Sequence, residues 1–269
     1  MSAGLAHAKL NLALVVGPLR ADGYHELVTV YVRLQLADCL ELEPAPSLGV
    51  TGFAGDTLVR AALERLAAEA GVPPAWHARI DKEIPVTAGL AGGSADAATA
   101  LRLANETLAQ PLPPERLQAL ARELGADVPL CLTEGAQLGR GDGSELEPLQ
   151  LPGDYAVLLW IPEGAQKEST GAVFADFDAR RGAVGFDERS AALERALADV
   201  HDARDLAALP LNDLASAPQA ATLLALGAFR ADVTGAGPTI YGLFDDPDAA
   251  QAALDHVSTR GRSWLTAPC

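Results

Sequence analysis

Short apolar runs alternate along the chain with segments of helical periodicity, and this alternation predicts a mixed α and β fold. Residues 9–14 alternate or run apolar, as in a strand with one face in a core. Similar patterns predict strands at 27–36, 76–84, 155–161 and 263–266, a further strand and loop over 38–50, and a hairpin over 229–244. Helical periodicity predicts helices at 56–71, 115–124, 189–200, 219–226 and 247–257.

A turn rich in Pro, Gly and Asp at residues 149–154 marks a shift in composition. We expect the domain boundary there, which gives domains at 1–150 and 151–269. The hairpin, the last helix and the last strand then make a βαβ-like small domain of the second half. The glycine-rich stretch 135–143, just before the boundary, is typical of a loop.

A second glycine-rich segment, residues 84–98, joins a short apolar run to an Ala-rich helical pattern that extends to about residue 108. Ser94 is expected to be the N-cap of that helix, because its hydroxyl can accept a bond from a first-turn amide. Glycines before a helix let several backbone amides converge, and the helix dipole adds positive charge, which favours an anion such as phosphate. The glycines alone leave a flexible strand-to-helix loop as an equal alternative.

Charge and composition limit the possible partners. The formal net charge is −16, which disfavours nucleic acid, and no run of about 18 apolar residues indicates a membrane span. The three cysteines are far apart, which argues against a disulfide framework. No secretory signal pattern opens the chain. We therefore expect a cytoplasmic protein without a nucleic-acid or membrane partner.

A few polar residues lie in otherwise apolar surroundings. Lys9 and Asn11 share one face of the first strand, where they either meet solvent or line a cleft. Tyr24 and His25 follow a tight turn and can stack on and hydrogen-bond a planar ring, or serve as strand residues. Asp127 lies between a helix end and a short apolar run, near a buried edge or as the cap of a turn. Lys167 is interpreted as a surface charge.

Several common nucleotide and hydrolase motifs are absent: the P-loop, the dinucleotide fingerprint, the zinc-protease motif and the nucleophile elbow. Five blocks remain, in a characteristic order and spacing. They are Ala8-Lys9-Leu10-Asn11-Leu12, the run 20–27, the run from Pro85 through Gly89-Leu90-Ala91-Gly92-Gly93-Ser94 to Ala98, the run 124–129, and Thr234-Gly235-Ala236-Gly237. Together they resemble the GHMP small-molecule kinases over residues 5–244.

That resemblance implies an α+β, two-domain GHMP kinase fold with the active site in the cleft between the domains. The N-terminal domain would be ribosomal protein S5 domain 2-like and the C-terminal domain ferredoxin-like. ATP and Mg²⁺ would be required, and the protein would be a monomer or weak homodimer. The blocks around Lys9 and Tyr24 resemble, more narrowly, the members that phosphorylate the free hydroxyl of 4-diphosphocytidyl-2-C-methyl-D-erythritol in the non-mevalonate isoprenoid pathway.

The resemblance also assigns roles. Asp127 would be the general base and Lys9 would assist it, because an ammonium beside a carboxylate favours the charged form and a developing alkoxide. ATP would be held by Lys82, Pro85, Gly89, Leu90, Ala91, Gly92, Gly93 and Ser94. The acceptor would be held by Asn11, Tyr24, His25, Phe174, Gly235 and Gly237, with Tyr24 stacking on the cytosine, His25 bonding to it and Phe174 closing the site. No protein ligand of the metal is assigned.

The chain departs from the family pattern at four positions. His7 replaces a usual Pro, Ala95 replaces a loop Ser, and Asp56 replaces a usual Asn near the adenine. Ala91 replaces a loop Gly, and its Cβ requires an ordinary φ there. Two alternatives stay open: a mevalonate- or homoserine-type GHMP kinase, which the Tyr24-His25 pair disfavours, and a catalytically silent regulatory protein with this fold.

Overall fold

The computed structural model describes residues 1–55, 58–165 and 169–269. The chain forms two compact units that are each discontinuous in sequence: residues 1–9, 36–86 and 91–134, and residues 10–35, 87–90 and 135–269. This division differs from a single boundary near residue 150 because two long strands, β1 (Ser2–Leu19) and β2 (His25–Pro44), contribute to both units. The ranges 1–150 and 151–269 stay a prediction.

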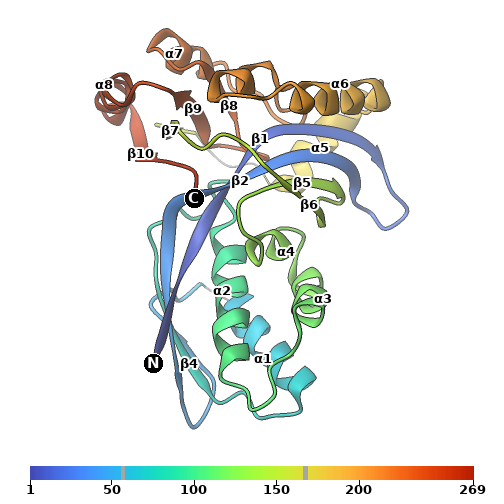
Figure 1. Ribbon diagram of the computed structural model, residues 1–269, viewed down its shortest axis with the longest axis vertical. Helices are drawn as coiled ribbons and strands as arrows, with labels where there is room; N and C mark the ends of the chain where they lie inside the picture. Colours follow the sequence, from blue (N-terminus) through green and yellow to red (C-terminus); the bar gives the residue numbers. More distant parts are fainter. Residues whose placement is uncertain (56–57, 166–168) are drawn as a thin grey trace. The chain divides into compact units, whose positions relative to one another are not determined.

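The first unit is a small sheet covered by helices. In its sheet β4 (Trp76–Asp81) lies between the C-terminal part of β2, which is antiparallel, and β3 (Gly49–Thr51), which is parallel. Its helices are α1 (Leu58–Ala70), α2 (Gly92–Glu106), α3 (Pro114–Leu124) and the short α4 (Val128–Cys131), and they lie side by side in Figure 1. Leu and Ala side chains from the sheet, α1 and α2 form one core. The predicted helices at 56–71 and 115–124 are confirmed over the described residues.

The second unit contains the N-terminal part of β2, which pairs with β5 (Ala136–Gly141), and β5 pairs with β6 (Glu145–Leu149). Residues 135–143 were expected to be a loop, and that prediction is wrong, because most of the stretch is strand. At least one glycine of this stretch, Gly139, is there for packing within the sheet and not for a turn. A Cβ there would come within 2.5 Å of the Tyr31 ring on the neighbouring strand, so only glycine leaves room for that aromatic side chain.

The rest of the second unit is a four-stranded antiparallel sheet in the order β10-β7-β9-β8. Its strands are β7 (Ala156–Pro162), β8 (Arg230–Val233), β9 (Ile240–Phe244) and β10 (Gly261–Thr266). Its helices are α5 (Thr170–Ala179), α6 (Phe186–Ala198), the 3₁₀ helix η1 (Ala203–Ala208), α7 (Ala220–Ala225) and α8 (Pro247–Ser258). Helices follow β7 and β9, so the connectivity is β-α-β-β-α-β, which is ferredoxin-like. The predicted hairpin and last helix are confirmed.

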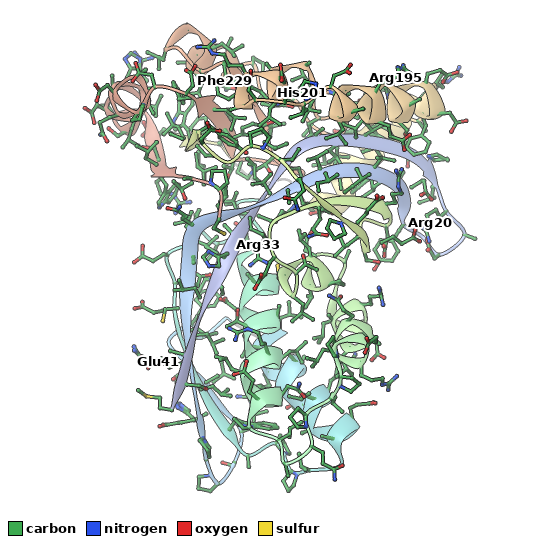
Figure 2. All side chains as sticks on the ribbon, in the orientation of Figure 1. Arg20, Arg33, Glu41, Arg195, His201 and Phe229 are labelled. Carbon is green, nitrogen blue, oxygen red and sulfur yellow. The ribbon has the colours of Figure 1, made fainter. Side chains whose placement is uncertain are left out.

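The connection between β1 and β2 is a charged turn. Arg20, labelled in Figure 2, forms ion pairs with Asp22 and with Glu26. Asp22 also accepts a hydrogen bond from the backbone N–H of Tyr24 at 3.0 Å. This small network sets the direction in which the chain enters β2 at His25. Within the described part of the chain, no helix has the length and apolar character needed to cross a membrane.

Candidate active site

The two predicted catalytic residues lie together in the first unit. Lys9 is on β1 and nearly inaccessible, at 6% exposure. Its Nζ is 3.8 Å from Oδ1 of Asp127, whose side chain is 36% exposed. Asp127 is the N-cap residue of α4, yet its carboxylate accepts no capping bond, so the alternative of a turn cap does not apply. The arrangement therefore leaves a carboxylate that is accessible to solvent beside a buried ammonium.

The glycine-rich segment enters α2 in a different way from the one expected. The helix begins at Gly92 and Ala91 is its N-cap, so the prediction that Ser94 caps the helix is wrong. The prediction of an ordinary φ at Ala91 is also wrong, because its φ is 56° and its ψ is 30°, the left-handed conformation. Thr87 has a φ of 59° as well. Two residues with a Cβ thus occupy backbone conformations that cost an L residue about 1–2 kcal/mol each.

The amides at the start of α2 point to an anion site. The first bond of the helix is from Ala95 N to Ala91 O at 2.9 Å. The N–H groups of Gly92, Gly93 and Ser94 therefore precede the first intrahelical bond, which is the usual state of a helix N-terminus. A Cβ added at Gly93 would meet no heavy atom within 4 Å. Open space beside first-turn amides is suited to a phosphate group.

Residues 87–90 of the same loop belong to the second unit and lie against the turn between β8 and β9. A Cβ at Gly89, whose φ is 83°, would be 3.0 Å from the carbonyl oxygens of both Gly237 and Thr234. The Thr239 hydroxyl donates to the Ala88 carbonyl at 2.7 Å. Two of the predicted binding glycines, Gly89 and Gly237, are therefore in one close backbone contact. A third, Gly235, lies in the same turn as Gly237. Pro85 and Leu90 are buried.

Lys82 is bound by two carboxylates. Its Nζ is 2.5 Å from Asp38 Oδ2 and 2.7 Å from Asp96 Oδ2. Both carboxylates are fully buried, and the lysine side chain is 15% exposed. Burial lowers the pKa of Lys82 and the bonds to Asp38 and Asp96 raise it, with a net pKa above its ordinary value. Lys82 is therefore a charged lysine that is held inside the protein.

Asn11 is held by two threonines. It is buried, its Nδ2 donates to Thr29 Oγ1 at 2.8 Å, and that hydroxyl donates to Ala13 O at 2.7 Å. Its backbone N–H donates to Thr234 Oγ1 at 3.0 Å. Asn11 is thus fixed in one orientation next to the turn that carries Gly235 and Gly237.

His25 is brought together with the predicted aromatic partner. The rings of His25 and Phe174 stack with centroids 4.6 Å apart and planes 21° apart. His25 Nε2 is 3.0 Å from Asp178 Oδ1. Tyr24 is more than half exposed, at 54%, and no stacking of its ring on Phe174 is found in the described part of the chain. Phe174 therefore stacks on the imidazole and not on the tyrosine.

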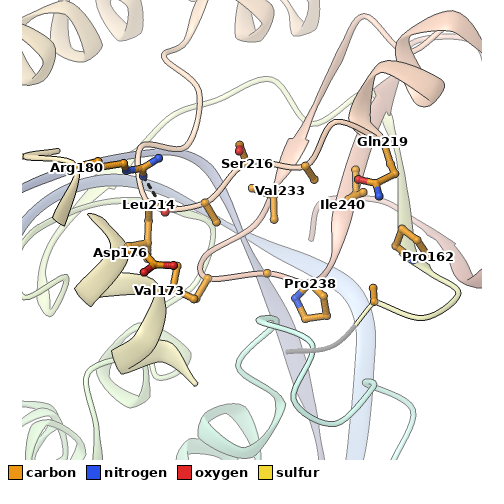
Figure 3. A pocket seen from close by; sticks show the side chains of 15 residues that line it. Pro162, Val173, Asp176, Arg180, Leu214, Ser216, Gln219, Val233, Pro238 and Ile240 are labelled. Atoms are coloured by element: carbon orange, nitrogen blue, oxygen red, sulfur yellow. Dashed lines mark hydrogen bonds between the residues drawn. The ribbon is translucent and has the colours of Figure 1, made fainter. Parts of the chain in front are cut away.

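A pocket of about 360 Å³ lies in the second unit, beside a different face of α5 from the one that carries Phe174 and Asp178. Figure 3 shows Val173 and Asp176 of α5, and Arg180 just after it, on one side and Pro238 on another. Arg180 donates to the backbone carbonyls of Asp213 and Leu214. Gly237 borders this pocket, so the turn predicted to meet the substrate lies at a real concavity.

The sequence missed several residues that hold the site. Asp38 lies in β2 and Asp96 in an Ala-rich helix, and both are charged residues in otherwise apolar stretches of sequence. Such a charged residue in an apolar stretch could have indicated a buried ion pair. Asp178 follows Phe174 by one helical turn, and Thr234 directly precedes Gly235. The predictions about Lys167 and Asp56 concern residues outside the described part of the chain.

Comparison with known proteins identifies the family. The model for the GHMP kinases N terminal domain matches residues 57–135, and the GHMP kinases C terminal model matches residues 217–263. A protein of Nocardia farcinica named 4-diphosphocytidyl-2-C-methyl-D-erythritol kinase is 40% identical, over 97% of this chain and 92% of its own. The chain belongs to the GHMP kinase family. A relative of the same name from Kineococcus radiotolerans is 38% identical, over 93% of this chain and 84% of its own.

Solved structures agree with this membership. A crystal structure of 4-(cytidine 5'-diphospho)-2C-methyl-D-erythritol kinase has 31% identity to this GHMP kinase and a TM-score of 0.79, with 99% of each chain covered. A mevalonate kinase structure has a TM-score of 0.78 at 12% identity, which shows the shared fold alone. The predicted α+β, two-domain fold is confirmed, with its S5 domain 2-like and ferredoxin-like halves. This GHMP kinase is an ATP-dependent small-molecule kinase.

Proposed function

We propose that this GHMP kinase transfers the γ-phosphoryl group of ATP to the free hydroxyl of 4-diphosphocytidyl-2-C-methyl-D-erythritol, in the non-mevalonate route to isoprenoid precursors. The approach of Lys9 to Asp127 is the observation that carries the chemistry. The acceptor is supported by the shared name of the curated relatives at 38–40% identity. It is supported also by the stacked rings of His25 and Phe174, two of the residues predicted to meet the cytosine.

The reaction removes the proton of the acceptor hydroxyl and transfers the γ-phosphoryl group of ATP to the acceptor oxygen. The Asp127 carboxylate takes the proton of the acceptor hydroxyl, and the freed oxygen forms a bond to the γ-phosphorus. The bond from that phosphorus to the bridging oxygen breaks, and ADP leaves. The Lys9 ammonium attracts the negative charge that develops on the acceptor oxygen.

The binding roles follow the predicted groups. The amides at Gly89 to Ser94 hold the ATP phosphates, with Leu90 and Pro85 as buried supports for the loop. On the acceptor side, His25 bonds to the cytosine, while Tyr24 and Phe174 provide its aromatic walls. Asn11 meets the acceptor hydroxyls, and the turn with Gly235 and Gly237 meets the diphosphate.

Mg²⁺ is proposed to enter with ATP. Among the described residues, no group of three His, Cys, Asp or Glu side chains is arranged to hold a metal ion. Mg²⁺ commonly takes most of its ligands from substrate phosphates and water. Ser94, in the first turn of α2, would supply a hydroxyl, and the ion would neutralise phosphate charge. We also propose, from the charge and hydropathy of the chain and from the family resemblance, that the enzyme is cytoplasmic, a monomer or weak homodimer, and free of nucleic-acid and membrane partners.

The test is an assay of ATP-dependent phosphorylation by the purified full chain and by Asp127→Asn. The acceptors are the cytidyl substrate, mevalonate and homoserine. We expect turnover of the cytidyl substrate alone, and a loss of about two to four orders of magnitude in kcat in the variant. A folded wild type that binds ATP but phosphorylates mevalonate or homoserine, or none of the three acceptors, would contradict the proposal.

A further inference from the structure

The Asp38–Lys82–Asp96 network connects the two ends of the phosphate loop. Asp38 accepts hydrogen bonds from the backbone N–H groups of Glu83 and Ile84, at 2.7 and 2.8 Å, both to Oδ1. Its other oxygen binds the Lys82 ammonium. The buried Asp38 carboxylate therefore holds Lys82, and it also holds the backbone of Glu83 and Ile84 at the entry to the loop.

The same ammonium holds the other end of the loop. Lys82 donates to Asp96, which lies in α2 just beyond its first turn. At the start of α2, a Cβ added to Gly92 would be 3.2 Å from Lys82 Nζ and 3.1 Å from Ile84 Cγ2. The first residue of the helix is thus packed directly against the ammonium and the loop entry.

The charge balance argues against a phosphate-binding role for the lysine itself. An ammonium has three N–H donors, and Lys82 directs two of them to carboxylates. One positive charge faces two buried carboxylates, so the trio has no net positive charge to offer a phosphate. Its Nζ also lies 5.8 Å from the centre of the Phe53 ring.

We propose that Lys82 is a positioning residue for the ATP loop, acting with Asp38 and Asp96. The network sets the position of the Gly92, Gly93 and Ser94 amides, and these amides, not the lysine, make the contacts with phosphate. Amides that are held in place before the ligand arrives bind it without the cost of ordering them. This inference rests only on the ATP half of the proposed function and is independent of the acceptor.

The decisive variants weaken the network without touching the loop backbone. Asp96→Asn leaves one ammonium with one carboxylate, and Asp38→Asn keeps the oxygen that accepts both amides but places an amide NH₂ against Lys82. Both side chains are fully buried. Asp81→Asn is the matched control, because Asp81 is an exposed carboxylate next to Lys82 that makes no bond to it.

Binding of ATP is measured by calorimetry on the full chain, well below the melting temperature of each variant, together with KM for ATP and for the acceptor. We expect Asp96→Asn and Asp38→Asn each to weaken ATP binding by about tenfold, with KM for the acceptor unchanged and kcat within about twofold. Asp81→Asn should match the wild type. Faster amide hydrogen exchange at Glu83 and Ile84 in Asp96→Asn would report the loosened loop directly.

Two results would overturn the inference. If Lys82 contacts phosphate itself, releasing it from Asp38 and Asp96 leaves ATP binding unchanged or tighter. If the network only stabilises the fold, the variants lower the melting temperature while ATP affinity stays at the wild-type value. If Asp38→Asn fails to fold, Asp96→Asn still tests the inference, because Lys82 and Asp38 remain as one ion pair with no net charge. A wild type that binds ATP but rejects the cytidyl acceptor would refute the proposed acceptor and leave this inference intact.

Discussion

The His25 imidazole and the Asp178 carboxylate form a fixed pair, with Nε2 and Oδ1 3.0 Å apart. An ionised carboxylate only accepts hydrogen bonds, so Nε2 must carry the proton. In the neutral ring the other nitrogen, Nδ1, is then an acceptor. The exocyclic amino group of cytosine is a donor, whereas uracil has a carbonyl oxygen at the same place. Under the proposed function, Asp178 therefore prepares His25 to accept a hydrogen bond from the cytosine amino group.

This pairing predicts a binding defect when Asp178 is removed. Asp178→Ala releases the proton on Nε2 and lets the imidazole take either tautomer, so part of the population presents a donor to the base. We expect KM for the cytidyl acceptor to rise by about tenfold, with kcat and KM for ATP little changed. Steady-state kinetics with both substrates varied will measure this.

Asp187→Ala is the matched control, because Asp187 is an exposed carboxylate in the first turn of α6 and does not line the pocket beside Gly237. The ¹⁵N shifts of His25 provide a second measurement, since they distinguish the two tautomers without any substrate. An unchanged tautomer in Asp178→Ala, or a fall in kcat at constant KM, would refute the assignment.

A second prediction concerns Ala91, whose φ of 56° is in the left-handed region. Ala91→Gly removes a conformational cost of about 1–2 kcal/mol in the folded state and adds about 0.4–1 kcal/mol of entropy to the unfolded state. We expect a net gain of up to about 1 kcal/mol in the free energy of unfolding. Urea denaturation of both proteins will measure it.

Gly89→Ala is the opposing control. Gly89 also has a positive φ, 83°, and its new Cβ would be 3.0 Å from two carbonyl oxygens. This variant should lose stability where Ala91→Gly gains it. If Ala91→Gly is destabilised instead, residue 91 does not adopt the left-handed conformation in solution.

The ferredoxin-like half could be predicted from sequence because its signals are local. Residues 229–244 alternate around a glycine turn, and 247–257 have helical periodicity, so each element is apparent without knowledge of its neighbours. The pairing of Lys9 with Asp127 was implied by the family resemblance alone. Their separation along the chain leaves no trace in the periodicity.

The start of α2 shows what local preference misses. Ser94 is a favourable N-cap and glycine a poor helix residue, so the sequence favours a helix that begins just after Ser94. The helix instead begins at Gly92, which packs closely against Ile84 and Lys82 and leaves little room for a Cβ. Tertiary contacts overrode the capping preference and also placed Ala91 in its unusual conformation.

The last prediction concerns Arg230, which is buried at 3% exposure. Its guanidinium donates to the Tyr241 hydroxyl and to backbone carbonyls of η1, of the segment after it and of Leu12 on β1. It thus satisfies carbonyl oxygens from three parts of the second unit. Arg230→Met leaves these buried acceptors without their donor and should lower the free energy of unfolding by about 3–5 kcal/mol.

Arg260→Met is the matched control, because Arg260 is exposed and its change should stay within about 0.5 kcal/mol. Arg230→Lys tests the geometry: an ammonium has fewer donors and no planar fork, so it should recover only part of the loss. Full recovery by lysine would mean that the positive charge, and not the set of carbonyl bonds, is what the fold requires at this position. Thermal and urea denaturation of the four proteins measures all of these differences.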